Sequence, residues 1–174
     1  MVAGNPVSQS HFFFYFAYGS NLLEERLHVQ IKDAVFECTG RLSNYKLCFY
    51  DDSSRWHGAL ASVEEVPGEE VWGCVWRVPN SFADELDLQE NVYKRLQVNI
   101  DVADSVISCR TYQYLLDSRK PALPSPHYKH VIVSGAIEHS LPPSYVAKLK
   151  EVKDNGYTGS VLVNLQALKN LPCK

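Results

Sequence analysis

Apolar and polar residues alternate in strand-like patterns over the first two-thirds of the chain and in helix-like patterns afterwards. Residues 12–17 are a continuous aromatic and apolar run, which is typical of a strand buried on both faces. A polar loop is predicted at 51–55, and turn chemistry at 42–44 and 66–69 separates neighbouring strands. The further strands are predicted at 34–39, 45–50, 56–63, 71–78, 96–102 and 106–116.

Helical patterns follow the first strand and fill the C-terminal third. A short helix is predicted from Leu22, with Ser20 or Asn21 as its cap. Ser81 and Asp84 form a predicted capping box for a helix over 81–90. Prolines at 121, 124 and 126 predict an exposed extended loop over 117–126. Further helices are predicted at 128–140, at 144–152 and, weakly, around 162–168.

This order of elements predicts an α+β fold with a small mixed or antiparallel β-barrel flanked by helices. Residues 1–11 are expected to be a flexible N-terminal lead-in, and 12–174 a single domain. With 45% hydrophobic and 21% charged residues, the composition is that of an ordinary globular chain.

Charge and cysteine content narrow the classes of partner. The net charge of −3 argues against nucleic acid, which requires a basic surface. No apolar run has the length of a membrane span, and 12–16 lacks the basic flank of a signal peptide. The five cysteines are odd in number and contain no C-x-x-C, so we expect reduced thiols and a cytoplasmic protein.

Two stretches suggest chemistry. The buried strand at 12–17 leads into Gly19, Ser20 and Asn21 at the start of a helix, where amide groups can bind an anion or an oxyanion. The alternative is that Gly19 only makes a tight turn and Ser20 only caps the helix. Glu90 ends the predicted 81–90 helix, where a carboxylate opposes the helix dipole; an apolar surrounding would raise its pKa and favour acid–base catalysis. The alternative is a solvated surface acid.

Other reaction types lack support in the sequence. The six histidines have no helical i, i+4 pair with an acid, and no cysteine joins them at ligand spacing, so no metal site is predicted. There is no G-x-S-x-G, G-x-G-x-x-G or phosphate-binding loop.

The motif Tyr-Phe-Ala-Tyr-Gly-Ser-Asn-Leu at 15–22 closely resembles the signature strand and loop of the γ-glutamylcyclotransferases. The resemblance extends over nearly the whole chain from 15 to 159. Its further pieces, in the order of the family, are 56–59, 68–73, 86–90, 124–129, 141–145 and 157–159.

The resemblance implies a cytoplasmic homodimeric enzyme with a small β-barrel. Such enzymes convert small γ-glutamyl amino acids into 5-oxoproline and a free amino acid, without a cofactor. By motif position, Glu90 would be the general base and acid. The residues that would bind substrate are Tyr15, Phe16, Ala17, Tyr18, Gly19, Ser20, Asn21 and Tyr128.

Two departures from the family pattern concern the surroundings of Glu90. Asn91 stands where members often have glycine, and asparagine tolerates a left-handed backbone better than most residues. The segment 93–97 also differs, and it is expected to border the pocket. Two alternatives therefore stay open: a sister activity on glutathione or γ-glutamyl-ε-lysine, and a ligand-binding homologue without turnover.

Overall fold

The computed structural model describes residues 11–89, 92–115, 117, 119–169 and 171. Apart from His11, the predicted lead-in at 1–11 lies outside these residues, as do Glu90 and Asn91.

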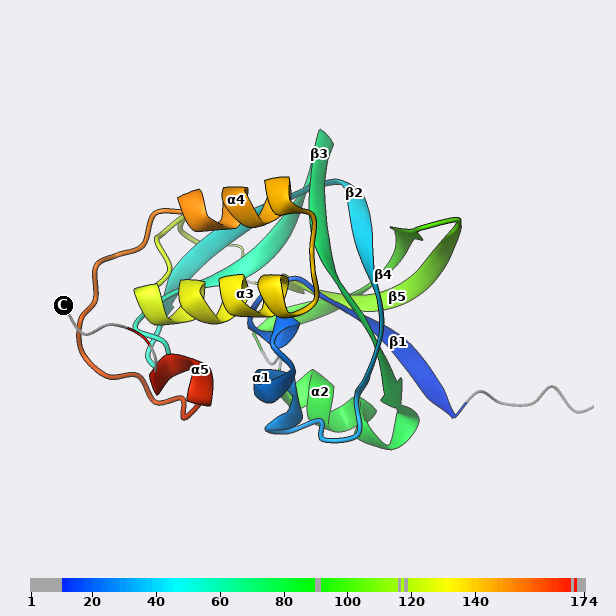
Figure 1. The fold of residues 1–174 in the computed structure, drawn as a ribbon, viewed down its shortest axis with the longest axis horizontal. Helices are drawn as coiled ribbons and strands as arrows, with labels where there is room; N and C mark the ends of the chain where they lie inside the picture. Colours follow the sequence, from blue (N-terminus) through cyan, green and yellow to red (C-terminus); the bar gives the residue numbers. More distant parts are fainter. Residues whose placement is uncertain (1–10, 90–91, 116, 118, 170, 172–174) are drawn as a thin grey trace, which may run out of the picture.

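The described strands form a closed barrel in the order β1-β3-β2-β4-β5 (Figure 1). Every neighbouring pair is antiparallel except β1 and β5, which run parallel. The predicted mixed barrel is therefore confirmed. The strands are β1 (Phe12–Ala17), β2 (Val35–Ser53), β3 (Gly58–Pro79), β4 (Tyr93–Val102) and β5 (Ser105–Tyr114).

The turns predicted at 42–44 and 66–69 are wrong, because β2 and β3 continue through them as one long hairpin. The pairing register shifts between Ser43, which pairs with Glu70, and Tyr45, which pairs with Glu65, so that Asn44 and residues 66–69 have no partner in the ladder. Asn44 and Gly68 both have positive φ, and the Asn44 side-chain oxygen accepts a hydrogen bond from the Gly68 amide at 3.0 Å. Residue types that usually make turns here form an irregularity inside a continuous ribbon.

The loop predicted at 51–55 and the strand start predicted at Trp56 are also shifted. Strand β2 extends to Ser53, which pairs with Gly58, the first residue of β3. Only residues 54–57 make the connection, and we call them the 54–57 connection below.

Two predicted helix caps are wrong. Ser20 and Asn21 lie inside a 3₁₀ turn, η1 (Ser20–Leu22), and α1 (Glu24–His28) follows without a side-chain cap. Ser81 likewise lies inside η2 (Asn80–Phe82), ahead of α2 (Ala83–Gln89). In both places a 3₁₀ turn precedes the helix.

The C-terminal helices are α3 (Pro126–Glu138), α4 (Pro143–Glu151) and α5 (Gln166–Lys169). Ser125, which sequence patterns did not suggest, caps α3: its hydroxyl accepts a hydrogen bond from the Tyr128 amide at 3.1 Å. Ser125 is fully buried, so the end of the 117–126 loop is not exposed as predicted. The last helix has four residues and is shorter than the prediction.

The parallel seam between β1 and β5 combines backbone pairing with side-chain hydrogen bonds. Tyr15 pairs with Arg110 across it. The Thr111 hydroxyl donates to the Phe16 carbonyl at 2.9 Å, and the Tyr18 hydroxyl donates to the Tyr112 carbonyl. These bonds join the end of β1 to the last strand of the barrel.

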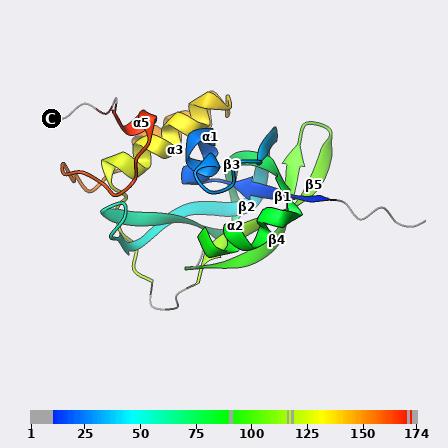
Figure 2. The same cartoon turned by 90° about the horizontal axis from the view of Figure 1, so that it is seen from below.

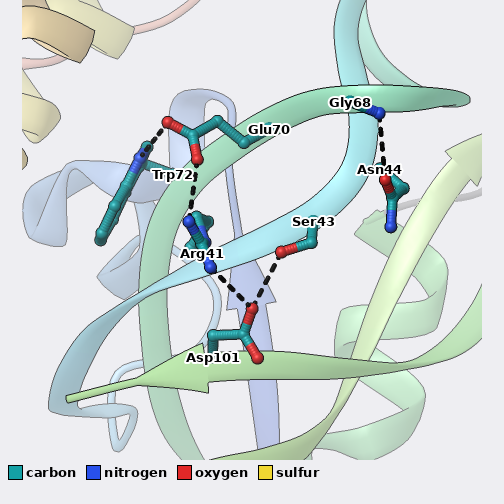
Figure 3. A network of polar contacts seen from close by, with 7 residues as sticks. All are labelled: Arg41, Ser43, Asn44, Gly68, Glu70, Trp72 and Asp101. Atoms are coloured by element: carbon teal, nitrogen blue, oxygen red, sulfur yellow. Dashed lines mark hydrogen bonds and ion pairs between the residues drawn. The ribbon is translucent and has the colours of Figure 1, made fainter.

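On the opposite side, a polar network joins β2, β3 and β4 (Figure 3). Arg41 contacts Glu70 at 3.3 Å and Asp101 at 3.4 Å, and the Ser43 hydroxyl donates to Asp101 at 2.9 Å. The strands approach closely here, since a Cβ on Gly40 would lie 2.3 Å from Ile100. Because these groups are partly exposed, the network contributes little energy but restricts the register.

Helix α3 packs beside α4 and against the segment that follows β1 (Figure 1). Figure 2 shows α1, α3 and α5 on the same side of the barrel. A Cβ on Gly135 would lie 2.5 Å from backbone atoms of Leu22 and Leu23. Only glycine allows this approach, which presses α3 onto η1.

Gly135→Ala is therefore expected to destabilise the protein. The added methyl group meets backbone that cannot rotate away, and overpacking costs roughly 1–3 kcal/mol, more than the roughly 1 kcal/mol that alanine gains in a helix. Urea unfolding followed by circular dichroism measures the change. Ser134→Ala, one residue earlier in α3, is the control and should stay within about 0.5 kcal/mol of the wild type. Equal stability of both variants would contradict the close packing.

Candidate functional site

A cavity of about 440 Å³ opens beside the end of β1. Its walls come from β1, η1, α1, α2 and α3, from the end of β2, the 54–57 connection and the start of β3, and from the start of β4 and the end of β5. The residues of the predicted substrate-binding set that line it are Tyr15, Tyr18, Gly19, Ser20, Asn21 and Tyr128. Segments more than a hundred residues apart in sequence therefore meet at one site.

Phe16 and Ala17 do not line this cavity. Both are buried in the barrel core, and the Phe16 ring lies where a Cβ on Gly73 would be 2.7 Å from it. Their contribution to the site is to anchor β1, which carries Tyr15 and leads directly into Tyr18.

Glu90 lies outside the described residues, but its neighbours on both sides reach the cavity. Leu88, near the end of α2, and Val92, just before β4, both line it. The wall of the cavity thus includes residues two positions before and two positions after Glu90.

Tyr128 is buried and is held by the strand opposite α3. Its hydroxyl accepts a hydrogen bond from the Ala61 amide at 3.0 Å. Its ring packs against Trp56 with a centroid distance of 5.0 Å. A Cβ on Gly19 would touch the same hydroxyl at 3.4 Å, so Tyr128 and the 18–21 turn are in direct contact.

Tyr93, Tyr112 and Tyr114 also line the cavity, and the pKa values of Tyr112 and Tyr114 are raised. The Tyr112 hydroxyl donates to Asp87 at 2.6 Å; burial, then this hydrogen bond and the nearby charge of Asp87, raise the pKa of Tyr112 well above its usual range. Burial and a hydrogen bond to Asp51 raise the pKa of Tyr114 to about 12. Both are neutral hydrogen-bond donors at physiological pH and cannot serve as the base.

The Asn21 side chain donates a hydrogen bond to the Tyr15 hydroxyl at 3.1 Å. The Tyr15 ring in turn packs edge-to-face on Tyr112, with centroids 5.9 Å apart. This chain of contacts fixes the positions of the polar groups around the turn.

The charged residues of the cavity were not predicted from the sequence. Arg26 lines it from α1 and is only 6% exposed, and Asp52 and Arg55 line its rim. An arginine on a short amphipathic helix and charges in a polar loop are normally solvent-exposed, so their sequence carried no signal. Tyr93 also lines the cavity and donates to the Ala61 carbonyl at 2.7 Å, in the segment expected to border the pocket.

Among the described residues, no three His, Cys, Asp or Glu side chains gather as metal ligands. None of the described helices combines the length and apolar composition that crossing a membrane requires.

Comparison with known proteins gives consistent matches. The model of the AIG2-like family matches residues 70–149. A γ-glutamylcyclotransferase of Mus musculus is 43% identical over 167 residues, covering 91% of this chain and 88% of the mouse protein. One of Homo sapiens is 44% identical over 158 residues, covering 86% and 83%. A solved structure named γ-glutamyl cyclotransferase superimposes with a TM-score of 0.85 at 39% identity, covering 91% of this chain and 96% of that one.

Tyr128→Phe is expected to lower the free energy of unfolding by about 1–3 kcal/mol, because the buried Ala61 amide loses its hydrogen-bond acceptor. Chemical denaturation measures this loss. The control is Tyr45→Phe, which removes a hydroxyl bonded to Glu65 at 3.1 Å on the surface and should cost less than about 0.5 kcal/mol. If both substitutions cost the same, the Tyr128 hydroxyl does not hold the cavity wall.

Proposed function

This chain belongs to the γ-glutamylcyclotransferase family, and we propose that its cavity converts γ-glutamyl amino acids into 5-oxoproline and free amino acids. The observation that carries the proposal is the meeting of the 18–21 turn, Tyr128 and both flanks of Glu90 around one cavity. The 43–44% identity to enzymes of this name supports the same reaction type.

The reaction needs no group from the protein other than a proton carrier. The α-amine of the glutamyl part attacks its own γ-carbonyl carbon, a five-membered lactam closes, and the bond to the leaving nitrogen breaks. The proton lost by the amine passes to that nitrogen, so atoms and charge balance without water. Because both reacting groups belong to one molecule, holding the folded conformer lowers the barrier by several kcal/mol.

Glu90 is the proposed proton carrier. A carboxylate near the amine accepts its proton and returns it to the leaving nitrogen, which typically contributes 10²–10⁴-fold. The placement of Leu88 and Val92 in the cavity wall supports this role. The protonated Tyr112 and Tyr114 beside them leave the task of base to another group.

The 18–21 turn is the proposed cradle of the glutamyl part. Gly19 and Ser20 line the cavity, and amide groups at the start of η1 can hold the α-carboxylate or the oxyanion that forms on the γ-carbonyl. Tyr128, in contact with Gly19, would orient the same part of the substrate.

Glu90→Gln is expected to lower kcat for γ-glutamyl-alanine by about 10²–10⁴-fold, since the amide cannot accept the proton. Release of 5-oxoproline, followed by chromatography, is the measurement. Glu85→Gln makes the same chemical change on the exposed face of α2 and serves as the control with normal turnover. Full activity of Glu90→Gln would disprove the mechanism.

The same assay, run with other γ-glutamyl compounds, decides between the alternative activities. Glutathione and γ-glutamyl-ε-lysine, tested beside γ-glutamyl-alanine, should be poorer substrates. Tight binding of γ-glutamyl-alanine without turnover would instead identify a ligand-binding homologue.

We also propose a homodimer in the cytoplasm, which the family resemblance supports. The described cysteines Cys38, Cys48, Cys74 and Cys109 are free thiols, as expected of a reducing compartment. Sedimentation equilibrium should give twice the chain mass of 19.7 kDa, and a monomer at micromolar concentration would contradict the dimer.

A further inference from the structure

The cavity presents two arginines from different elements, Arg26 from α1 and Arg55 from the 54–57 connection. Arg26 is buried, whereas Arg55 is exposed at the rim. A γ-glutamyl amino acid carries two carboxylates, one on the glutamyl part and one on the amino acid that leaves. The cavity is therefore lined by one buried arginine and one exposed arginine.

Arg55 has no ion-pair partner among the described residues. Arg41, Arg95, Arg110 and Arg119 each contact an acid within 4 Å, whereas no acid of the described part of the chain lies this close to the Arg55 guanidinium. Asp52 lies on the same rim without forming an ion pair with it. The guanidinium is therefore available to an anionic ligand.

The backbone that carries Arg55 is nevertheless well fixed. Its carbonyl accepts a hydrogen bond from the Leu162 amide at 3.1 Å. The next residue, Trp56, is buried against Tyr128, and the His57 amide donates to the Ser53 carbonyl at 2.7 Å. An exposed cation on an anchored turn loses less freedom when it binds a ligand.

The direction of the substrate follows from its chemistry. The α-amine and α-carboxylate that must be oriented for ring closure both belong to the glutamyl part, which we place at the 18–21 turn. The leaving amino acid then extends towards the rim, from which it can depart. Arg55 lies on this rim, and a guanidinium matches a carboxylate with two parallel hydrogen bonds.

We propose that Arg55 is a specificity-determining residue that binds the α-carboxylate of the leaving amino acid. This inference rests on the proposed function, and it assigns the substrate class as γ-glutamyl α-amino acids in preference to γ-glutamyl amines and amides. The residue does not take part in ring closure, so its effect falls on KM more than on kcat.

The test compares γ-glutamyl-alanine with γ-glutamyl-alaninamide, which has nearly the same shape but lacks the charge. Arg55→Gln should lower kcat/KM for γ-glutamyl-alanine by about tenfold, mainly through KM, and leave the amide substrate within about twofold. Arg55→Lys should recover part of the loss, because it restores the charge without the planar fork.

Arg77→Gln is the matched control, since this exposed arginine packs over Phe12 and does not line the cavity. It should leave both substrates unchanged. Equal effects of Arg55→Gln on the two substrates, or no effect on either, would overturn the assignment of Arg55 while the proposed function stands. If the wild-type protein turns over neither substrate, the proposed function is wrong and the assignment fails with it.

Discussion

Closure of the barrel between its first and last strands is the constraint on which the cavity depends. Where β1 meets β5, hydroxyl groups add to the backbone pairing: Thr111 donates to the Phe16 carbonyl and Tyr18 to the Tyr112 carbonyl. Tyr18 and Tyr112 also line the cavity. The bonds that close the barrel therefore place part of the site, and a change in pairing at this seam would displace both.

Helix α3 holds the same region from the other side. Its cap at Ser125 orders the first turn, where Tyr128 reaches across to the Ala61 amide, and Gly135 presses on the backbone after Asn21. The 18–21 turn is thus held between a barrel seam and a helix. Such support from rigid elements suits a cradle that must keep a small flexible substrate in one folded conformer.

Elements whose residue pattern fits only one kind of structure were predictable from the sequence. The aromatic run at 12–17 predicted the bounds of β1 correctly, although only residues 15–17 are buried and 12–14 are half-buried. Asn44 and Gly68 predicted turns wrongly, because the same residue types also occur where two paired strands shift register. The placement of Arg26 and Arg55 in the cavity could not be predicted, because the sequence does not show which surface a charged side chain faces. The role of Glu90 came from family resemblance and remains a prediction.

The pairing of β1 with β5 also has a consequence during synthesis. Phe16 and Thr111 are 95 residues apart, and a ribosome adds roughly 5–20 residues per second, so the partner of β1 appears about 5–20 s later. Through that interval the first strand, one of the most aromatic segments of the chain, has an unsatisfied edge. During synthesis this aggregation-prone N-terminal segment therefore has to be protected, either by early pairing with β3 or by binding to a chaperone. The active site can form only afterwards.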